Sequence, residues 1–342
     1  MRLTLPVLAW SQRNGLFFAL AIMIVFFSLA SERFLTPENI SVILQQVAVV
    51  GIIAVPGAML VLAGYVDLSV GSIAVFAATI FGKSMEAGLG LPLALLFGLG
   101  AGTAWGVLNG WLIARLDFSP IIVTLGGLAG ARGLSELITL GFAVFGFGPA
   151  FAWLGNGAIL SVPVPVWIFA LIFVIGAHVW YQTPSGRHMV AIGGAREAAK
   201  ALGIKTQTIP FWLYVASGAA ASLGGLIVTS QLDGSSVSIG TGMELDVLTA
   251  ILLGGVAFTG GRGSLLGVLF GVLFIGALTN GLIQININPY FQKVAVGIAL
   301  ISAAGLDILY QRLDRVRVPE EPREAIPDSA ALASGEAERT PS

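Results

Sequence analysis

The stretch "NISVILQQVAVVGIIAVPGAMLVLAGYV", residues 39–66, contains no charged side chain. A helix needs about 20 mostly apolar residues to cross the hydrocarbon core of a bilayer, so this stretch can cross it once. The rest of the chain has a similar character, because 56% of its 342 residues are hydrophobic and only 10% are charged. Soluble domains carry roughly 25% charged residues. The composition therefore predicts a protein that lies in a membrane.

Further uncharged runs on both sides of this stretch predict further spans. The runs 14–31, 87–114, 206–232 and 263–292 are each long enough to include a spanning helix. Shorter runs can also span when the charged side chains at their ends reach the interface. The expected helices lie near 15–31, 40–62, 69–84, 90–113, 120–140, 165–181, 209–230, 246–260, 264–284 and 290–310. We therefore predict an all-α integral membrane protein with about ten transmembrane helices.

The Lys and Arg residues are distributed unevenly between the expected loops. Ten spans bring both termini to the same side, and a cytoplasmic N-terminus leaves only Arg33, Lys83 and Lys293 in outside loops. The basic residues on the inside are then Arg2, Arg13, Arg115, Arg187, Arg196, Lys200, Lys205, Arg262, Arg312, Arg315 and Arg317. Since cytoplasmic loops carry an excess of Lys and Arg, this asymmetry predicts that the N- and C-termini are both cytoplasmic.

The chain is predicted to form one polytopic transmembrane domain, residues 1–317, followed by a tail. The tail, 318–342, is rich in Pro, Glu, Ala and Ser and has little apolar surface to bury. We therefore expect it to be a disordered cytoplasmic tail. Within the domain, the glycine cluster "GGVAFTGGRGS", 254–264, predicts a tight turn between the expected eighth and ninth helices.

The longest polar segment between two expected spans is 182–208, on the predicted cytoplasmic side. Within it "AREAAKAL", 195–202, combines good helix formers with apolar residues on one side, and Gly203 follows. This pattern predicts a short amphipathic helix. Such a helix can dock into a groove of another protein. A plain loop that lies on the lipid headgroups fits the composition equally well.

No motif in the sequence indicates catalysis, a nucleotide site or a metal site. The chain has no cysteine, so disulfides and thiolate metal sites are excluded. The residues "GKS", 82–84, resemble the end of a phosphate-binding loop, but Ala77 stands where that motif requires glycine. His178 and His188 have no carboxylate or nucleophile at motif spacing. We therefore expect a protein that is not an enzyme and that binds no cofactor of its own.

Three charged residues stand in apolar surroundings. Asp67 lies in "GYVDLSVGS", 64–72, at the junction of the second and third expected helices. It can act as a proton or ion site, or it can cap the next helix and shape the loop. Arg132 and Glu136 are four residues apart on one helix face, so they are expected to pair. That pair is either structural or part of a water-lined path.

Four stretches, in order along the chain, resemble the permease subunits of ribose/xylose/arabinose-type ABC sugar importers, which are related to branched-chain amino acid ABC permeases. "GYVDLSVGS" is similar to the family's GGxDLSVGS, and "SPIIVTLGGLAGARGL" to its proline-led TLG segment with a downstream Arg-Gly. "GRHMVAIGGAREAAKALGI" is similar to its cytoplasmic GxNxxAAxxxGI loop, and "LLGGVAFTGGRGS" to its LGGxxxxGGxGS. The resemblance covers roughly 35–310. Tyr65 stands where the family usually has a second glycine, and Ala195 where it usually has asparagine.

The resemblance implies a subunit of an ABC importer that moves a pentose-like or hexose-like monosaccharide across the bacterial inner membrane into the cytoplasm. It implies three protein partners. These are an ATP-binding subunit that hydrolyses ATP, a periplasmic or extracellular sugar-binding protein, and a second permease chain that is identical or different. Membrane lipid surrounds the subunit, and nucleic acid is not a partner. The segment 187–205 would be the coupling helix that meets the ATP-binding subunit.

Three sets of candidate site residues follow from the resemblance and from polar residues in otherwise apolar helices. Contact with the ATP-binding subunit is expected from Gly193, Gly194, Glu197, Ala198, Ala199, Gly203 and Ile204. The signature loop, which we expect to shape a break between two spans near the pathway, contains Asp67, Ser69, Gly71 and Ser72. The substrate path is expected to include Asn109, Thr124, Arg132, Asn280 and Gln284.

Two other functions stay open at the level of sequence. One is a secondary transporter driven by an ion gradient, with Asp67 or the Arg132 and Glu136 pair as the relay. The other is an ABC importer permease for another small polar solute, such as a branched-chain amino acid. A requirement for ATP distinguishes the importers from the ion-coupled transporter.

Overall fold

The computed structural model describes the backbone of residues 5–317 and the side chains of 15–288 and 290–305. Internal contacts divide the chain into one unit that ends at Ala304 and a second that begins at Gly305. The predicted disordered tail, 318–342, lies outside the described residues.

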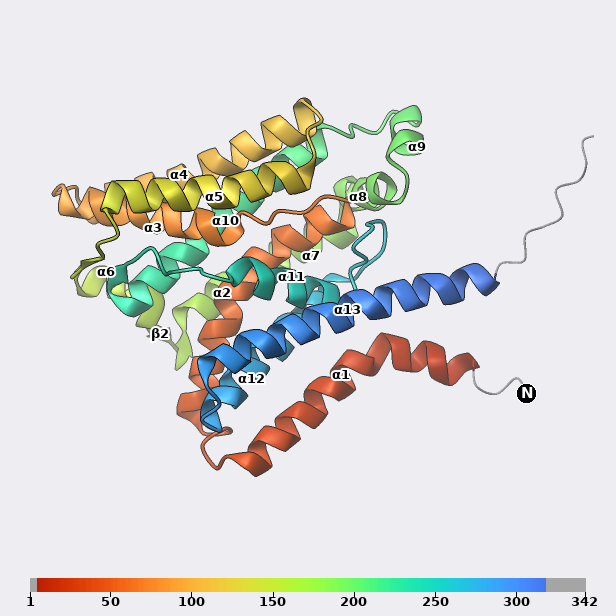
Figure 1. The fold of residues 1–342 in the computed structure, drawn as a ribbon, viewed down its shortest axis with the longest axis horizontal. Helices are drawn as coiled ribbons and strands as arrows, with labels where there is room; N and C mark the ends of the chain where they lie inside the picture. Colours follow the sequence, from red (N-terminus) through yellow and green to blue (C-terminus); the bar gives the residue numbers. More distant parts are fainter. Residues whose placement is uncertain (1–4, 318–342) are drawn as a thin grey trace, which may run out of the picture. The chain divides into compact units, whose positions relative to one another are not determined.

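Helices form almost all of the described structure (Figure 1). They are α1 (Leu5–Ala30), α2 (Pro37–Leu62), α3 (Val70–Glu86), α4 (Leu91–Gly110), the π-helix η1 (Trp111–Arg115), α5 (Pro120–Thr139), α6 (Pro149–Asn156), α7 (Val164–Gln182), α8 (Pro184–Gly194), α9 (Arg196–Ala201), α10 (Thr208–Leu232), α11 (Met243–Leu253), α12 (Leu265–Gln284) and α13 (Pro289–Arg317). Two short antiparallel strand pairs complete the secondary structure, β1 (Val144–Phe145) with β4 (Gly234–Ser235) and β2 (Ala158–Ile159) with β3 (Val162–Pro163).

Six helices in the described part of the chain are long and apolar enough to cross a membrane. They are α2, α4 together with η1, α5, α7, α10 and α12. The described parts of α1 and α13 add shorter apolar stretches, Gly15–Ala30 and Tyr290–Gly305. The expected class, an all-α protein that passes through the membrane several times, agrees with this structure.

The expected helix near 246–260 is shorter than predicted. Its counterpart, α11, has 11 residues and ends at Leu253. At 1.5 Å per residue it is about 16 Å long, roughly half the thickness of the hydrocarbon core. Gly255 follows with φ of +82°, a left-handed conformation that favours glycine and ends helices. The residues 254–264 form the connecting segment that the glycine cluster predicted.

Two helices occupy the polar segment 182–208, where one was expected. The predicted short helix is present as α9, and Gly203 follows it with φ of +78°. The preceding α8 was not predicted. Pro184 at its first position gave a signal for it, because the fixed φ of proline suits the first turn of a helix.

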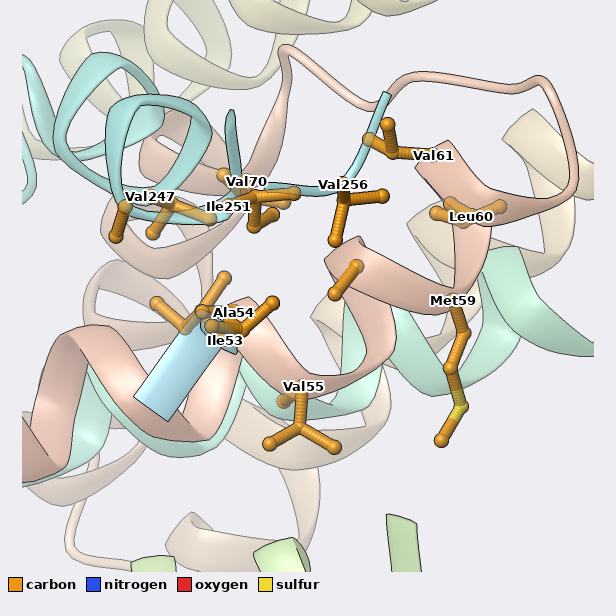
Figure 2. Packing of buried hydrophobic residues seen from close by; sticks show 14 of the residues in the cluster. Ile53, Ala54, Val55, Met59, Leu60, Val61, Val70, Val247, Ile251 and Val256 are labelled. Carbon is orange, nitrogen blue, oxygen red and sulfur yellow. The ribbon is translucent and has the colours of Figure 1, made fainter. Parts of the chain in front are cut away.

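Helix α2 lies at the centre of the packing. Every residue from Gly51 to Leu62 is buried, and α2 contacts α7, α10, α11 and α12. Figure 2 shows part of this core, in which side chains from α2, α3, α11 and the segment after α11 meet; they include Ile53, Ala54, Val70, Val247, Ile251 and Val256. The first half of α2 is less buried than the second, so the tightest packing lies near the end that precedes the signature loop.

Glycine brings α4 and α10 into direct backbone contact. A Cβ atom on Gly106 of α4 would lie 2.5 Å from the Tyr214 carbonyl oxygen and 3.1 Å from the Gly218 Cα atom. A Cβ atom on Gly218 would lie 2.5 Å from the Gly102 carbonyl oxygen. Helices in lipid gain little from hydrophobic burial, so close packing of small residues supplies much of their attraction. These glycines therefore hold α4 against α10.

We predict that Gly106→Ala destabilises the protein, because the added methyl group overlaps backbone atoms that have no rotamer with which to move away. The expected loss is about 1–3 kcal/mol of unfolding free energy, typical of overpacking. Thermal unfolding of the purified protein in one detergent measures it.

Gly100→Ala is the matched control on the same helix, since nothing lies within 4 Å of a Cβ atom at Gly100. Alanine is the better helix former, so this variant should be as stable as the natural protein or more stable by up to about 1 kcal/mol. Equal destabilisation by both substitutions would contradict the packing argument.

Candidate functional site

The loop 63–69, between α2 and α3, is organised around the Asp67 carboxylate. Its Oδ1 atom accepts hydrogen bonds from the backbone N–H of Ser69, at 3.0 Å, and from the Ser69 hydroxyl. Its Oδ2 atom accepts a hydrogen bond of 2.8 Å from the hydroxyl of Ser217 in α10. Three donors therefore satisfy a carboxylate that lies between two apolar helices, which reduces the cost of holding it there.

The expected cap of α3 by Asp67 is not formed. The N-cap residue of α3 is Ser69, and no side chain bonds to the free N–H groups of the first turn. Asp67 bonds instead to the N–H of Ser69 itself, one residue before the helix begins. An aspartate that bonds to the backbone two residues ahead stabilises a turn. Asp67 thus shapes the loop, and the helix starts without a side-chain cap.

Two further hydrogen bonds attach this loop to its neighbours. The Ser69 hydroxyl accepts a hydrogen bond of 2.9 Å from the side-chain amide of Asn109 in α4. The Tyr214 hydroxyl, from α10, donates to the Val66 carbonyl oxygen at 2.9 Å. Loop 63–69 is therefore linked to α4 and α10 as well as to its own helices.

The other two signature residues, Gly71 and Ser72, lie in the first turn of α3. A Cβ atom on Gly71 would lie 2.6 Å from the Gly240 carbonyl oxygen, so the segment before α11 passes directly against the start of α3. Ser72 is fully buried, and its hydroxyl has no hydrogen-bond partner among the described residues. The four residues of the signature loop therefore lie together, although only two of them bond to each other.

The predicted ion pair between Arg132 and Glu136 does not form. The Arg132 guanidinium instead donates a hydrogen bond of 2.9 Å from Nη1 to the Thr241 hydroxyl, in the segment before α11. Glu136 is exposed on the surface of α5. Helical spacing places the two residues on one face of α5, but Arg132 bonds to Thr241, which is distant in the sequence.

The five residues predicted to line a substrate path fall into separate groups. Asn109 bonds to the signature loop, and the buried hydroxyl of Thr124 bonds to the Pro120 carbonyl oxygen of its own helix. The side-chain amides of Asn280 and Gln284, in α12, both bond to Asn39 at the start of α2. The five residues thus bond to different partners, and their role in a path stays a prediction.

The segment 182–208 presents a charged surface. Arg196, the first residue of α9, pairs with Asp117 at 2.7 Å between Nη1 and Oδ1. Partial burial opposes the charge of Arg196, but the hydrogen bond to Asp117 raises the pKa of the guanidinium above its ordinary value. A cavity of about 350 Å³ adjoins this pair; it is lined by Asp117, Arg196, Glu197, Lys200, Ile204, Lys205, Thr206, Gln207 and Thr208.

The seven residues predicted to contact another subunit differ in exposure. Four are exposed, namely Gly194, Glu197, Ala198 and Gly203. Ala199 is buried, and Ile204 is partly buried. Gly193 lies against the end of α2, where a Cβ atom would overlap the Leu62 carbonyl oxygen. The exposed part of α9 is therefore the surface that is free to meet another protein.

Asp117 is a charged residue of this surface that the sequence analysis did not single out. It lies between η1 and α5, has φ of +61°, and is 66% exposed in its side chain. The neighbouring η1 is a π-helix, an irregularity that often marks functional positions, and its Arg115 lies over the ring of Phe211 in α10. Nothing near Asp117 in the sequence indicated its pairing with Arg196, because the contact is tertiary.

We predict that Asp67→Ala lowers the unfolding free energy by about 1–3 kcal/mol, because it leaves buried donors without an acceptor. Asp67→Asn should cost less than half as much. The amide oxygen can accept from Ser69, and the amide nitrogen can donate to the Ser217 hydroxyl. Thermal unfolding of the two variants in one detergent measures the difference, with Ser236→Ala as the control, because the partly buried Ser236 hydroxyl bonds to Ser238, two residues away, on the exposed side of its segment. Equal losses for both Asp67 variants would show that the charge itself is required.

Comparison with known proteins agrees with a transport role. A family model described as "Branched-chain amino acid transport system / permease component" matches residues 39–304. The chain is 37% identical over 298 residues to the ribose import permease protein RbsC of Bacillus subtilis (strain 168), covering 86% of this chain and 92% of the relative. It is 33% identical over 304 residues to the L-arabinose ABC transporter permease protein AraH of Azospirillum brasilense, covering 89% of each chain.

A third relative is the D-allose transport system permease protein AlsC of Escherichia coli (strain K12), with 34% identity over 306 residues, 88% of this chain and 93% of the relative. All three relatives are named as permease proteins of transport systems. The match to the family model covers most of the chain, and the relatives are covered almost from end to end. The chain therefore belongs to the family of branched-chain amino acid transport system permease components.

Proposed function

We propose that this protein is the permease subunit of an ABC importer that moves a monosaccharide into the cytoplasm. The observation that carries this proposal is the similarity, over most of both chains, to permeases named for ribose, arabinose and allose. A sugar is neutral and carries several hydroxyl groups, so its path needs polar side chains but no strong charge. The polar side chains of the spanning helices fit that requirement, since most of them are hydroxyls and amides.

In the proposed topology the chain crosses the membrane ten times, and both termini are cytoplasmic. The membrane is the inner membrane of a bacterium. The distribution of Lys and Arg supports this orientation. In this arrangement the eighth crossing consists of the segment 234–242 followed by the half-length α11, while the other crossings are helices. Irregular backbone within a membrane is stable where protein or water surrounds it, and the contact of Gly240 with α3 supplies protein surroundings.

The proposed partners are an ATP-binding subunit, an external sugar-binding protein and a second permease chain. The chain supplies no ATP hydrolysis of its own in this proposal, so ATP is the cofactor of the partner. The exposed face of α9, with Glu197 and Lys200, is the proposed contact with the ATP-binding subunit. Short helices suit this purpose, because they fill a groove with a few side chains on one face.

The proposed passage of the sugar depends on weak contacts. Asn109, Asn280 and Gln284 already bond to protein partners, so they are less free to bind a sugar than their positions in the sequence suggest. Arg132 keeps a buried Nε–H without a partner among the described residues. Its side chain is therefore the best candidate among the five for a contact with a passing hydroxyl group.

Uptake into proteoliposomes tests the proposed function. The permease is reconstituted with its ATP-binding subunit and its binding protein. Radiolabelled ribose or a related monosaccharide should then cross the vesicle membrane only when ATP is present on the side where the ATP-binding subunit lies. Uptake of leucine in place of every sugar tested would change the cargo to a branched-chain amino acid. Uptake that follows an imposed ion gradient without ATP would overturn the importer and favour a secondary transporter.

We predict that a combined change on α9 and just after it, Glu197→Ala, Lys200→Ala and Leu202→Asp, releases the ATP-binding subunit. Leu202 is 81% exposed, so the change alters the surface and leaves the core intact. Loss of a central apolar contact and two charges typically weakens an interface by tenfold or more, about 1.4 kcal/mol per factor of ten. Co-purification from membranes measures the effect.

The control for this variant is Lys83→Ala with Glu86→Ala, which removes an exposed ion pair of 2.7 Å at the end of α3. It also removes two charges from the surface, but it lies on the opposite side of the membrane in the proposed topology. The ATP-binding subunit should remain bound to the control. Retention by the α9 variant would place the contact elsewhere.

A further inference from the structure

Three glycine-containing segments that are far apart in the sequence meet backbone to backbone. They are the end of α2 with Gly64, the end of α8 with Gly193, and the loop after α11 with Gly260 and Gly261. A Cβ atom on Gly260 would lie 2.9 Å from the Gly64 Cα atom and 3.0 Å from the Gly193 Cα atom. We call these four residues the glycine joint.

Hydrogen bonding and backbone conformation both fix the glycine joint. The N–H of Gly261 donates a hydrogen bond of 2.8 Å to the Leu62 carbonyl oxygen, which connects the loop to the last turn of α2. Gly64, Gly260 and Gly261 have φ of +82°, +83° and +74°, a region that side chains rarely allow. Contacts between backbone atoms cannot relax by a change of rotamer. The joint is therefore stiffer than a contact made by side chains.

The second attachment of the segment 182–208 is of a different kind. Ala195, between α8 and α9, is extended, with φ of −159° and ψ of 92°. Beyond it α9 is held to the loop before α5 by the pair of Arg196 and Asp117, whose side chains are 35% and 66% exposed. Exposed ion pairs contribute little and are screened by salt. The segment is thus attached by backbone contacts at α8, and at α9 by this ion pair together with the buried side chain of Ala199.

The glycine joint leads directly into the signature loop. Gly64 is three residues before Asp67, whose carboxylate connects the loop to α10, and Ser69 connects it to α4. Any displacement of α8 that the joint transmits would therefore move loop 63–69 together with its attachments. The described contacts of α9 are made by side chains, namely the pair of Arg196 and Asp117 and the buried Ala199, whereas the contact at the end of α8 is made by backbone atoms.

We propose that the glycine joint is the link that transmits motion from the ATP-binding subunit to the spanning helices, with Gly64, Gly193 and Gly260 as its positioning residues. This inference rests on the proposed function, since it requires an ATP-binding subunit that acts on α8 and α9. In this mechanism α9 makes the contact, α8 moves with it, and the joint carries the displacement to the end of α2 and to the Asp67 loop.

Gly193→Ala tests the joint in the reconstituted importer. Gly193 is helical, so alanine suits its backbone, but the added Cβ atom would overlap the Leu62 carbonyl oxygen and lie 2.5 Å from the Gly261 nitrogen. We expect the complex to assemble and to hydrolyse ATP, while the sugar transported per ATP falls about tenfold or more, as expected when overpacking disturbs the joint. Gly126→Ala, on α5 with nothing within 4 Å of its Cβ atom, should keep the natural ratio.

A normal ratio of transport to hydrolysis in Gly193→Ala would overturn the inference. Failure of the natural complex to couple ATP to uptake would instead overturn the proposed function, so the two failures can be told apart. The ratio also separates a transmitting role from a purely structural one. A merely unstable subunit lowers the amount of complex, and transport and hydrolysis then fall together.

A second measurement needs no change within the joint. The chain has no cysteine, so spin labels can be placed at Val190→Cys on α8 and Phe258→Cys on the loop after α11. Both side chains are exposed, by 42% and 48%. If the joint is rigid, the distance between the labels stays the same in the nucleotide-free and the ATP-bound importer. A change of this distance during the cycle would overturn the inference, whatever Gly193→Ala does to assembly.

Discussion

Close approach of backbones at glycine is the constraint on which this structure depends. Inside a bilayer, apolar side chains gain little by leaving lipid for protein, so helices are held by van der Waals packing and by hydrogen bonds. The glycines of α4 and α10 remove the side chains that would keep these helices apart. The same arrangement joins α11 to α12, where a Cβ atom on Gly271 would overlap the Ala250 carbonyl oxygen. Many of the 45 glycines therefore lie at contacts between helices, and these contacts position the segments that are proposed to have a function.

Polar side chains in the interior mostly hold helices together. Asp67 connects its loop to α10, Asn109 connects α4 to the loop, and Asn39 joins the start of α2 to the end of α12. A buried polar group without a partner is costly, so each of these residues bonds to a polar side chain of another element. This explains why the polar residues that looked like a substrate path are distributed over several contacts.

The segment 182–208, which is proposed to meet the ATP-binding subunit, is attached to the rest of the protein in two different ways. Its first helix, α8, ends in a contact of backbone atoms, while its second, α9, follows an extended residue and is held through side chains, by one partly exposed ion pair and by the buried Ala199. A stiff contact suits a helix that transmits a displacement, and an adaptable attachment suits a helix that must fit the groove of a partner. The same short segment provides both, because Gly193 and Arg196 lie on either side of Ala195.

The sequence by itself determined the class of the protein, because long uncharged runs have no stable place except a membrane. It also predicted α9 and the glycine turn at 254–264, since both depend on local signals: helix formers before Gly203, and glycines where φ is positive. The tertiary structure alone decided the partners of the polar residues. Arg132 bonds to Thr241 and not to Glu136, and Asp117 pairs with Arg196, although spacing along the chain favoured neither contact. It also ended α11 at Leu253 and brought Gly64, Gly193 and Gly260 together. Such contacts join residues that are distant along the chain, and no local pattern carries their geometry.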